Sequence, residues 1–562
     1  MASQVDNTEP NAEEKLGAAH LEGGQMAKKN EISDIANDAQ VATEKERSMT
    51  LLQGVKLYPK AIGWSVLFST AIIMEGYDVV LMASLFAFPT FKERYGDIQP
   101  DGSYELPANW QAGLQNAMAI GQFVGLFFNG VLCDRFGYRK TMMGCLSLCV
   151  AFIFVLFFAP SKPALLLGEF FLGIPLGAFQ TLSVTYAAEV CPVVLRSYLT
   201  TYVNLCWLMG QILASGVLRA LLSRTDQWGY RIPFALQWAW PVPIAIGCLL
   251  APESPWWLVR AGRMDEARNA LKRLASSDAS GGDYDPTETI AMMVHTNEME
   301  MEINSGTSYL DCFKGTDLRR TEIACCTWAA QNLCGAGLMG YSTYFYKAAG
   351  LPDEQAFSMS LALYAIGIVG TLLSWVFMSY LGRRTLYVGG LWALFAVLMI
   401  VGFISLAPAT GPDGINEKAS WATGSMLLVF AFIYDGTIGP VCFSLVSEMP
   451  STRLRNKTTV LARNLYNVVN ITNGIIPYML NPTAWDWGGR AGFFWGGFCF
   501  ISAVWAFFRL PEPKGRTFAE LDVLFEKKIN ARKFKTTAVT PFDVSGEEKV
   551  VEEDSTKFFA AG

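Results

Sequence analysis

The sequence predicts an all-α membrane protein with twelve transmembrane helices in two six-helix halves, joined by a cytosolic helical linker. Of its 562 residues, 52% are hydrophobic and only 17% are charged, whereas soluble domains contain about 25% charged residues. Twelve apolar segments approach the roughly 20 residues that a helix needs to cross a bilayer. Charged motifs of the first half recur at a constant spacing in the second half, which indicates an internal repeat.

The apolar segments divide into two groups of six, separated by a polar stretch from about 252 to 322. The expected spans are 61–86, 110–132, 141–159, 164–188, 198–222, 231–250, 323–347, 357–380, 385–407, 422–446, 457–480 and 491–509. The polar stretch contains RMDEARNALKRL, which has the periodicity of an amphipathic helix, and then the turn-rich segment SSDASGGDYDP.

These features predict five regions and an orientation. The regions are a disordered cytosolic tail (1–57), the N-terminal half (58–251), the linker (252–321), the C-terminal half (322–510) and a cytosolic tail (511–562). Lys and Arg gather in the loops that lie on the same side as the N-terminus, such as CDRFGYRK, LGRRT and TRLRNK. Because cytosolic loops of membrane proteins are enriched in these residues, we expect both termini in the cytosol.

The repeat is visible in two acidic–basic motifs. Glu189 stands seven residues before Arg196, and Glu448 stands seven residues before Arg455, so the two pairs are 259 residues apart. Glu253 and Glu512, each within a Pro-Glu dipeptide, have the same separation. Two similar six-helix halves follow from these correspondences.

Several motifs together carry a resemblance to a known family. GVLCDRFGYRK, AAEVCPVVLRS, PESPWWL, SLVSEMPSTRLR and PEPKGRTF, taken in this order over roughly 60 to 525, resemble the sugar porter family of the major facilitator superfamily. MEGYDVVLM, GPVCFSLVSE and PESPWWLVRAGR are most similar to the fungal maltose and α-glucoside permeases, which are proton symporters. The resemblance implies a major facilitator fold and alternating access around a central site.

The function implied by this resemblance is proton-coupled import of sugars across the plasma membrane, with α-glucosides such as maltose as the favoured substrates. Alternatives are a symporter or facilitator for a hexose, another disaccharide or a polyol, and a sugar sensor that does not transport. The expected partners are the sugar, protons and the lipid bilayer. We expect no enzyme activity, cofactor, metal site, nucleic acid or obligate protein partner, since the sequence shows no nucleotide loop, metal-ligand cluster or activated nucleophile.

Two carboxylates stand deep in the first span, in the stretch MEGYDVVLM. Glu75 and Asp78 are three residues apart and therefore share a helical face. Ionisable residues at this depth are costly and usually functional, and a low dielectric favours their neutral form. We expect one or both to carry the coupled proton, the alternative being a static pair with a basic residue.

The proton-coupling group is expected to include residues from two further spans. The family pattern GRxxxG in the fourth span has an Arg where this chain has Glu169. Arg463, about eight residues into the eleventh span, is the basic residue available instead. We therefore predict a cluster of Glu75, Asp78, Glu169 and Arg463, although Glu169 could alternatively face a cytosolic vestibule without a role.

The predicted sugar-binding residues are mostly amides. Asn467 and Asn470 belong to a stripe of Asn residues at three-residue spacing in the eleventh span, which suits either sugar hydroxyls or interhelical hydrogen bonds. Family positions and the spans themselves add further candidates, which are Asn204, Gln211, Gln331, Asn332, Tyr341, Asp435 and Phe443.

A cytosolic charge latch is the third predicted feature. The resemblance implies that opposite charges at the helix ends of both halves hold the cytosolic side closed. The residues expected to form the latch are Asp134, Arg135, Arg139, Glu189, Arg196, Glu253, Arg383, Glu448, Arg455 and Glu512. Ser379 stands where the family pattern has Asp, so we expect the latch to be weaker in the second half.

Overall fold

The structure is a computed structural model that describes residues 49–537, except 101, 277–285, 305–307, 409–415, 452–453, 515 and 517. Most of the predicted N-terminal tail, most of the turn-rich linker segment and the end of the C-terminal tail lie outside the described residues. The chain divides into two compact units. One comprises the chain up to Ile62, Glu189–Arg196 and Pro252–Ser305, and the other comprises the remaining residues.

The smaller unit contains the predicted linker helix. It holds α2 (Leu51–Leu57), α12 (Pro255–Arg260), α13 (Met264–Leu274) and α14 (Thr287–Asn304). The amphipathic segment RMDEARNALKRL forms α13, which buries Ala267, Ala270, Leu271 and Leu274 on one face. The acidic residues in its first turn and the basic residues in its last turn complement the helix dipole.

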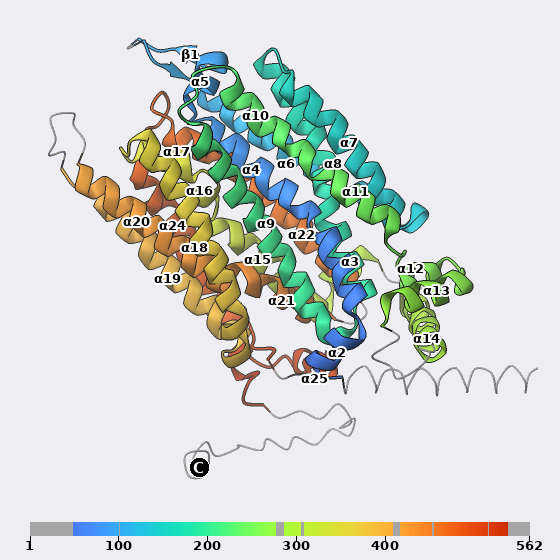
Figure 1. The fold of residues 1–562 in the computed structure, drawn as a ribbon. Coiled ribbons are helices and arrows are strands. Elements are labelled where there is room, and N and C mark those ends of the chain that lie inside the picture. The colour runs from blue at the N-terminus through green and yellow to red at the C-terminus, as the bar shows by residue number, and fades with distance from the viewer. Residues whose placement is uncertain are drawn as a thin grey trace, which may run out of the picture. The chain divides into compact units, whose positions relative to one another are not determined.

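The larger unit contains the membrane-spanning helices, apart from short end segments of three of them (Figure 1). Those of the first half are α3 (Pro59–Ser69) with α4 (Ala71–Leu85), α6 (Ala108–Phe136), α7 (Tyr138–Phe157), α8 (Lys162–Val190), α9 (Val193–Leu221), and α10 (Trp228–Leu236) with η1 (Gln237–Ala239) and α11 (Pro241–Leu250). Those of the second half are α15 (Gly315–Leu333) with α16 (Gly337–Gly340) and α17 (Ser342–Ala348), α18 (Asp353–Tyr380), α19 (Arg383–Ile404), α20 (Glu417–Ile433) with η3 (Tyr434–Ile438) and α21 (Gly439–Glu448), α22 (Arg455–Ile471) with η4 (Thr472–Ile475) and α23 (Ile476–Leu480), and α24 (Ala491–Arg509).

Ten of the described segments are long and apolar enough to cross a membrane. The seventh and eleventh predicted spans are broken instead. In the seventh, the chain leaves the helix at Gly335, whose φ of 92° is strained for other residues. In the eleventh, α22 is polar and gives way to a 3₁₀ turn before α23. Interrupted helices at this depth occur where the backbone lines a site rather than lipid.

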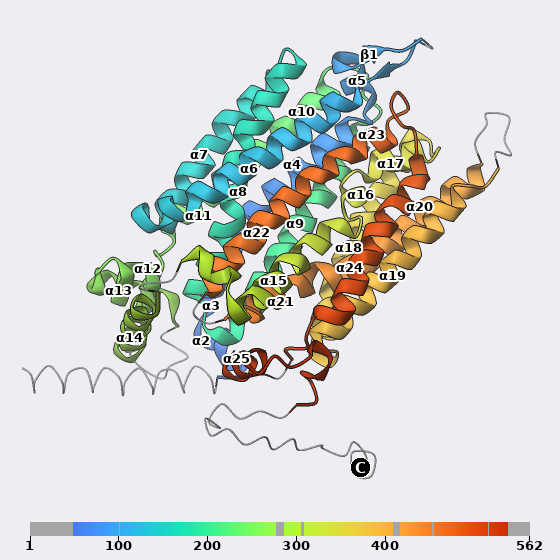
Figure 2. The ribbon, with the colours of Figure 1, turned by 180° about the vertical axis from the view of Figure 1, so that it is seen from behind.

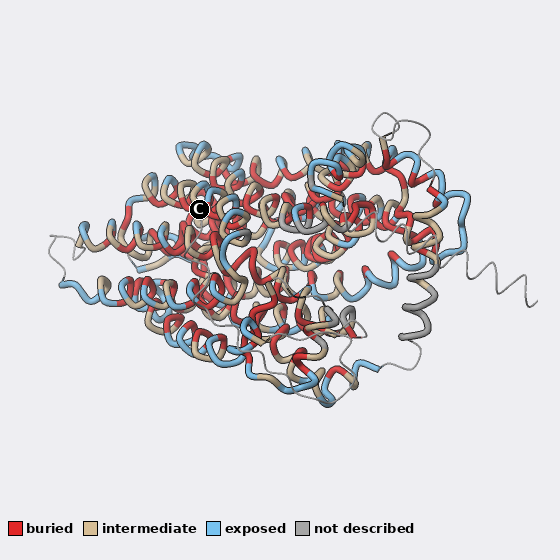
Figure 3. Tube along the Cα trace, turned by 90° about the horizontal axis from the view of Figure 1, so that it is seen from below, coloured by how far each residue is buried: buried red, intermediate tan, exposed pale blue. Residues whose placement is uncertain are grey.

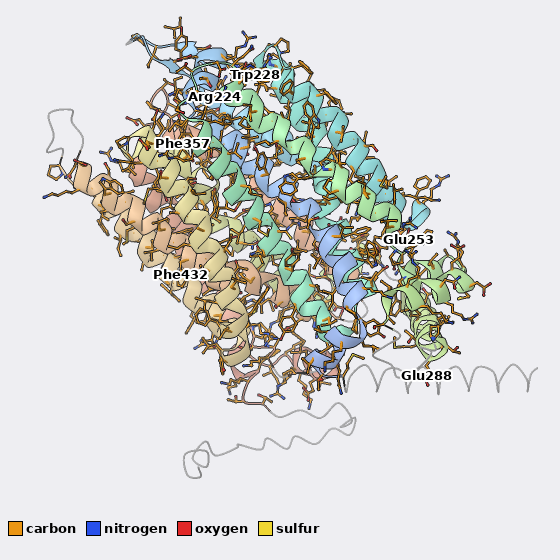
Figure 4. All side chains as sticks on the ribbon, viewed as in Figure 1. Arg224, Trp228, Glu253, Glu288, Phe357 and Phe432 are labelled. Atoms are coloured by element: carbon orange, nitrogen blue, oxygen red, sulfur yellow. The ribbon has the colours of Figure 1, made fainter. Side chains whose placement is uncertain are left out.

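A short hairpin lies between the first and second spans, at the end of the bundle that the predicted topology places outside. After α5 (Pro89–Tyr95), β1 (Asp97–Ile98) pairs antiparallel with β2 (Tyr104–Glu105). The prediction of a purely helical chain did not include this hairpin. Arg224 and Trp228 lie at the same end, where α9 leads into α10 (Figure 4).

Glycines let the helices around the centre approach one another at backbone distance. A Cβ atom on Gly76 of α4 would lie 2.1 Å from the carbonyl oxygen of Trp207 on α9. A Cβ atom on Gly177 of α8 would lie 2.2 Å from the carbonyl oxygen of Gln122 on α6. Only glycine fits at such contacts, so these positions hold α4, α6, α8 and α9 close together.

The burial pattern matches a protein solvated by lipid. The exposed positions of the spanning helices, coloured pale blue in Figure 3, include many large apolar side chains such as Phe127, Phe128 and Ile501. Buried charged side chains are few among the described residues: Glu75, Asp78, Glu105, Glu169, Arg320, Asp435 and Glu512. Because a buried charge is costly unless it has partners, these residues are candidates for a functional site.

Candidate functional site

The first group of buried polar residues links the two halves of the bundle. Glu75 of α4 accepts hydrogen bonds through Oε1 from Gln122 of α6, at 3.3 Å, and from the side-chain amide of Gln180 of α8. The Oε1 atom of Gln180 in turn accepts a hydrogen bond from Arg463 of α22. Gln180 therefore joins a carboxylate of the N-terminal half to a guanidinium of the C-terminal half, and we call Glu75–Gln180–Arg463 the amide bridge.

Aromatic rings hold Arg463 in place. Its Cζ atom lies 4.6 Å from the ring centroid of Tyr466 and 5.4 Å from that of Trp328 on α15. Phe443 of α21 packs edge-to-face against Trp328, with the ring centroids 6.2 Å apart. Figure 2 shows α22 between α15 and the helices of the first half. Cation–π contacts in a dry environment contribute about 2 kcal/mol, so Arg463 is well positioned.

The second group is a pair of carboxyl groups inside the N-terminal half. Asp78 Oδ1 accepts a hydrogen bond of 2.6 Å from Gln237 of η1. Glu169 of α8 has no accessible surface and lies in hydrogen-bonding contact with Asp78. Apart from each other, Asp78 Oδ2 and the two oxygens of Glu169 have no hydrogen-bond partner among the described residues. We call Asp78–Glu169 the carboxyl pair.

The four residues predicted as one charge cluster thus lie in two centres that share α4. Glu75 and Arg463 meet through Gln180, whereas Asp78 and Glu169 meet each other directly. The full burial of Glu169 differs from the alternative of an open vestibule. Sequence reasoning missed the three glutamines Gln122, Gln180 and Gln237. Their signal was an amide within an otherwise apolar span, because an amide is costly to bury unless it is hydrogen-bonded, although less costly than a charge.

Three of the amides predicted to bind sugar bond to neighbouring helices. Asn204 Nδ2 donates to Thr371 Oγ1 of α18 at 3.4 Å, and Gln331 Nε2 donates to the carbonyl of Gly439 at 3.3 Å. Asn332 Nδ2 donates to the carbonyl of Tyr466 at 3.3 Å. These long bonds connect helices across the bundle, and each leaves further amide hydrogen-bonding capacity.

The remaining predicted sugar-binding residues are buried or half-buried in the larger unit. Asn467 has a buried Nδ2 without a described hydrogen-bond partner, and Asn470 accepts from Asn473 at 2.9 Å. Gln211 and Tyr341 are buried. Asp435 lies in the π-helical turn η3, and its Oδ2 would be 2.6 Å from a Cβ on Gly367. A single π-helical turn inside a helix is frequent at functional sites.

The end of the bundle with the hairpin is closed by bonds between the halves. Tyr344 of α17 donates to Glu105 Oε1 at 2.8 Å, and Gln111 Nε2 donates to the hydroxyl of Tyr344 at 3.3 Å. Glu105 also forms an ion pair with Lys92. Asn481 Nδ2 donates to the carbonyl of Leu106 at 3.0 Å. We call the contact of Tyr344 with Glu105 the outer gate.

The latch candidates at the opposite end show the repeat in their contacts. Arg139 donates from Nε and Nη2 to the carbonyls of Cys248 and Leu249, at the end of α11. Arg384, which lies 245 residues later, donates in the same way to Leu510 and Phe507 at the end of α24. These bonds place Arg139 on carbonyls that lack helical partners, and its part in the charge latch stays a prediction.

Carboxylates of the predicted latch have basic or backbone partners. In the larger unit, Arg383 Nη2 lies 3.4 Å from Glu448 Oε1, and Glu512 accepts from the backbone N–H groups of Arg383 and Arg384. In the smaller unit, Glu189 accepts from Arg260 Nη2 at 2.6 Å. Asp134 and Arg135 are exposed at the end of α6, and Glu253 Oε1 accepts from the N–H of Ser254. The side chains of Arg196 and Arg455 lie outside the described residues.

Spanning helices in two related halves, with buried carboxylates and amides between them, define a secondary transporter. Comparison with known sequences identifies the kind: the chain belongs to the sugar (and other) transporter family, whose model matches residues 64–525. The predicted family and the twelve-helix fold are thereby confirmed.

Similar proteins include two permeases of Saccharomyces cerevisiae. The chain is 44% identical over 511 residues to a general alpha-glucoside permease, covering 90% of this chain and 82% of that protein. It is 44% identical over 516 residues to maltose permease MAL61, covering 91% and 83%. Among solved structures, XylE bound to 6-bromo-6-deoxy-D-glucose, a proton:xylose symporter, superposes with a TM-score of 0.66 at 19% identity, covering 84% of this chain and 100% of that one. This likeness shows the fold.

Proposed function

We propose that this chain imports α-glucosides such as maltose together with protons, by alternating access, across the plasma membrane with both termini in the cytosol. The amide bridge is the observation that carries the proposal. It connects a protonatable carboxylate of one half to a cation of the other, so a proton on the carboxylate acts directly on the contact between the halves. The names of the similar permeases support the choice of α-glucosides.

The proton acts by changing what Glu75 can accept. The ionised carboxylate receives hydrogen bonds from Gln122 and Gln180, and this orients the oxygen of Gln180 toward Arg463. A protonated Glu75 is a weaker acceptor and becomes a donor, so Gln180 is no longer held in that orientation. Arg463 then loses a charge-assisted hydrogen bond of about 1.5–3 kcal/mol. Proton binding at Glu75 and contact between the halves are therefore linked.

The carboxyl pair supplies a second protonatable centre. Two carboxylates in contact in a low-dielectric interior cannot both be ionised at reasonable cost, and neither oxygen of Glu169 has another described donor. One proton between Asp78 and Glu169 removes one of the two charges and joins the groups by a hydrogen bond. The substrate would be bound by the amides of Asn204, Gln331, Asn332 and Asn467, where sugar hydroxyls can replace the long bonds to neighbouring helices. Moving one charge inward through the membrane field contributes about 2.3 kcal/mol per 100 mV.

The test is sugar-triggered alkalinisation of the medium by transporter-null yeast expressing this chain. Maltose, trehalose, sucrose and glucose are offered separately to wild type, Asp78→Asn, Glu75→Gln and the control Glu93→Gln, whose side chain is exposed on α5. We expect an α-glucoside to alkalinise the medium in wild type and in the control. We expect the alkalinisation to be lost in Asp78→Asn and in Glu75→Gln.

Each other outcome has a defined meaning. Sugar uptake by wild type without any proton signal would show a facilitator in which the carboxylates are structural. A response to glucose alone would assign a hexose substrate. An absence of uptake for every sugar, with the protein present at the cell surface, would favour a sensor over a transporter.

A further inference from the structure

A cavity lies away from the amide bridge and the carboxyl pair, at the end of the bundle opposite the hairpin. It is formed by the first turn of α15 (Gly315, Thr316 and Arg319), the last residues of α24 (Phe508 and Arg509) and the C-terminal segment 525–531. This segment follows α25 (Phe518–Glu526) and leads into η6 (Ala531–Lys533). The cavity has a volume of about 510 Å³, which is within the usual range for small-molecule sites.

Its charged lining is entirely basic. Arg319, Arg509 and Lys528 line the cavity, and no acidic residue is among the described residues that form it. Glu322 binds Arg509 in a bidentate ion pair and also lies near Arg319, so a single carboxylate is set against three cations. Arg509 and Arg319 are close enough to repel each other. The cavity therefore carries an excess of positive charge that a bound anion would relieve.

The side chain of Arg319 is fixed by its neighbours and keeps an N–H group available for an anion. Its Nη1 atom donates to the carbonyl of Ile529 at 2.9 Å, and its Cζ atom lies 5.4 Å from the ring centroid of Phe525 and 5.8 Å from that of Phe534. These contacts fix the guanidinium plane. Its Nε–H is buried and has no hydrogen-bond acceptor among the described residues, so part of the donor capacity of a fixed arginine stays unused.

The position of the cavity indicates where the anion comes from. It adjoins the last turn of a spanning helix, where Phe507 and Phe508 are exposed. The Cζ atom of Arg532 lies 5.1 Å from the ring centroid of each of them. Leu318, in the first turn of α15, is also exposed. Aromatic and basic residues together mark the headgroup region of a bilayer, and this end of the bundle is the predicted cytosolic side, where anionic lipids are concentrated.

We propose that this cavity binds a phosphate-bearing anion, and that its position selects the headgroup of an anionic phospholipid of the cytosolic leaflet. Arg319 and Lys528 contact the phosphate oxygens, while Phe507 and Phe508 face the acyl chains. Because Arg319 and Ile529 come from separate elements, the bound headgroup joins the start of α15 to the C-terminal segment. The site is independent of sugar recognition.

The experiment measures lipid binding to the purified full-length chain in phosphatidylcholine nanodiscs, with and without a minor fraction of phosphatidylinositol 4-phosphate. Native mass spectrometry counts retained lipid, and thermal unfolding reports stabilisation. Lys528→Glu is compared with Lys527→Glu, because both lysines are exposed and only Lys528 lines the cavity. We expect Lys528→Glu to weaken lipid binding about tenfold, the effect of losing one charge-assisted hydrogen bond, and Lys527→Glu to retain it.

Further arms separate the sources of phosphate and guard against misfolding. Stabilisation by inorganic phosphate or a soluble inositol phosphate, equal to that by the lipid, would keep the anion site and reject the lipid as its occupant. Arg319→Gln adds a second test of the site, and Lys528→Glu stays informative if Arg319→Gln does not fold. Equal weakening of lipid binding by both lysine variants would overturn the proposal in favour of nonspecific charge. The proposal would also be overturned if none of the lipid, inorganic phosphate and the inositol phosphate bound.

Discussion

Gln180 of the fourth span accepts a hydrogen bond from Arg463 of the eleventh. In this contact Arg463 bonds to a neutral amide and not to a carboxylate. The carboxylate of Glu75 bonds to the other end of the same amide. An amide between the two charges keeps them from forming a direct ion pair, which in a low-dielectric interior would be hard to break. A contact of intermediate strength suits a transporter that must open and close repeatedly.

The amide bridge predicts a large effect of Gln180→Leu, which preserves volume and removes both hydrogen bonds. We expect sugar uptake to fall about tenfold to a hundredfold, since two buried charged groups each lose a bond of about 1.5–3 kcal/mol. Uptake of labelled maltose, normalised to surface protein, is the measurement. Gln99→Leu, in the hairpin outside the spans, is the control. Wild-type uptake by Gln180→Leu would exclude the bridge from the transport cycle.

The carboxyl pair predicts a difference between two replacements of Glu169. Glu169→Gln keeps a group that can donate to Asp78, so we expect folded protein and uptake within a few-fold of wild type. Glu169→Leu leaves the Oδ2 atom of Asp78 buried without a donor, at a cost of about 1–3 kcal/mol or more. Thermal unfolding of the detergent-solubilised protein should therefore rank wild type and Glu169→Gln above Glu169→Leu. The reverse ranking would show that Glu169 does not serve Asp78 as a hydrogen-bond partner.

The outer gate predicts a conformational effect of Tyr344→Phe. The variant removes the bond to Glu105 and the bond from Gln111 without changing packing, which weakens the closed outer side by about 1–3 kcal/mol. The outward-open population should rise, and with it the rate at which a membrane-impermeant thiol reagent labels a cysteine placed at Ser84, a buried outer position that contacts Thr343. Tyr104→Phe, on the exposed face of the hairpin, provides the comparison. Equal labelling in both variants would argue against the gate.

The sequence was sufficient for the architecture because lipid imposes simple rules on it. The length of the apolar segments predicted the spans, and the positions of Lys and Arg predicted their orientation. Ten of the spans are helices that are long and apolar enough to cross a membrane. The seventh and eleventh were harder to delimit, since their polar residues face the interior rather than lipid. The hairpin at Asp97–Ile98 and Tyr104–Glu105 is only two residues long in each strand, which is too short for a recognisable alternation of side chains.

The site was predictable in its charges and less so in its connections. Glu75, Asp78, Glu169 and Arg463 stand out because each charge is costly in an apolar span. Which carboxylate meets which partner depends on the rotation and approach of the helices. That approach is set by glycines such as Gly76 and Gly177, where helices meet at backbone distance. The bridging role of Gln180 follows only from this packing.

The contact of Gly382 with Glu512 gives a last prediction, on stability. Glu512 is buried and accepts the N–H groups of Arg383 and Arg384 at the start of α19, so it acts as the cap of that helix. A Cβ atom at position 382 would lie 2.0 Å from Glu512 Oε2. We expect Gly382→Ala to displace the carboxylate and lower the free energy of unfolding by about 1–3 kcal/mol.

Gly389→Ala is the matched control for this change. It lies in the same helix, and no atom is within 4 Å of the added Cβ. Alanine is favoured over glycine inside a helix by about 1 kcal/mol, so the thermal stability of the control should stay the same or rise. If Gly382→Ala were as stable as the control, the carboxylate would be free to move, and Glu512 could not be the cap that fixes the start of α19.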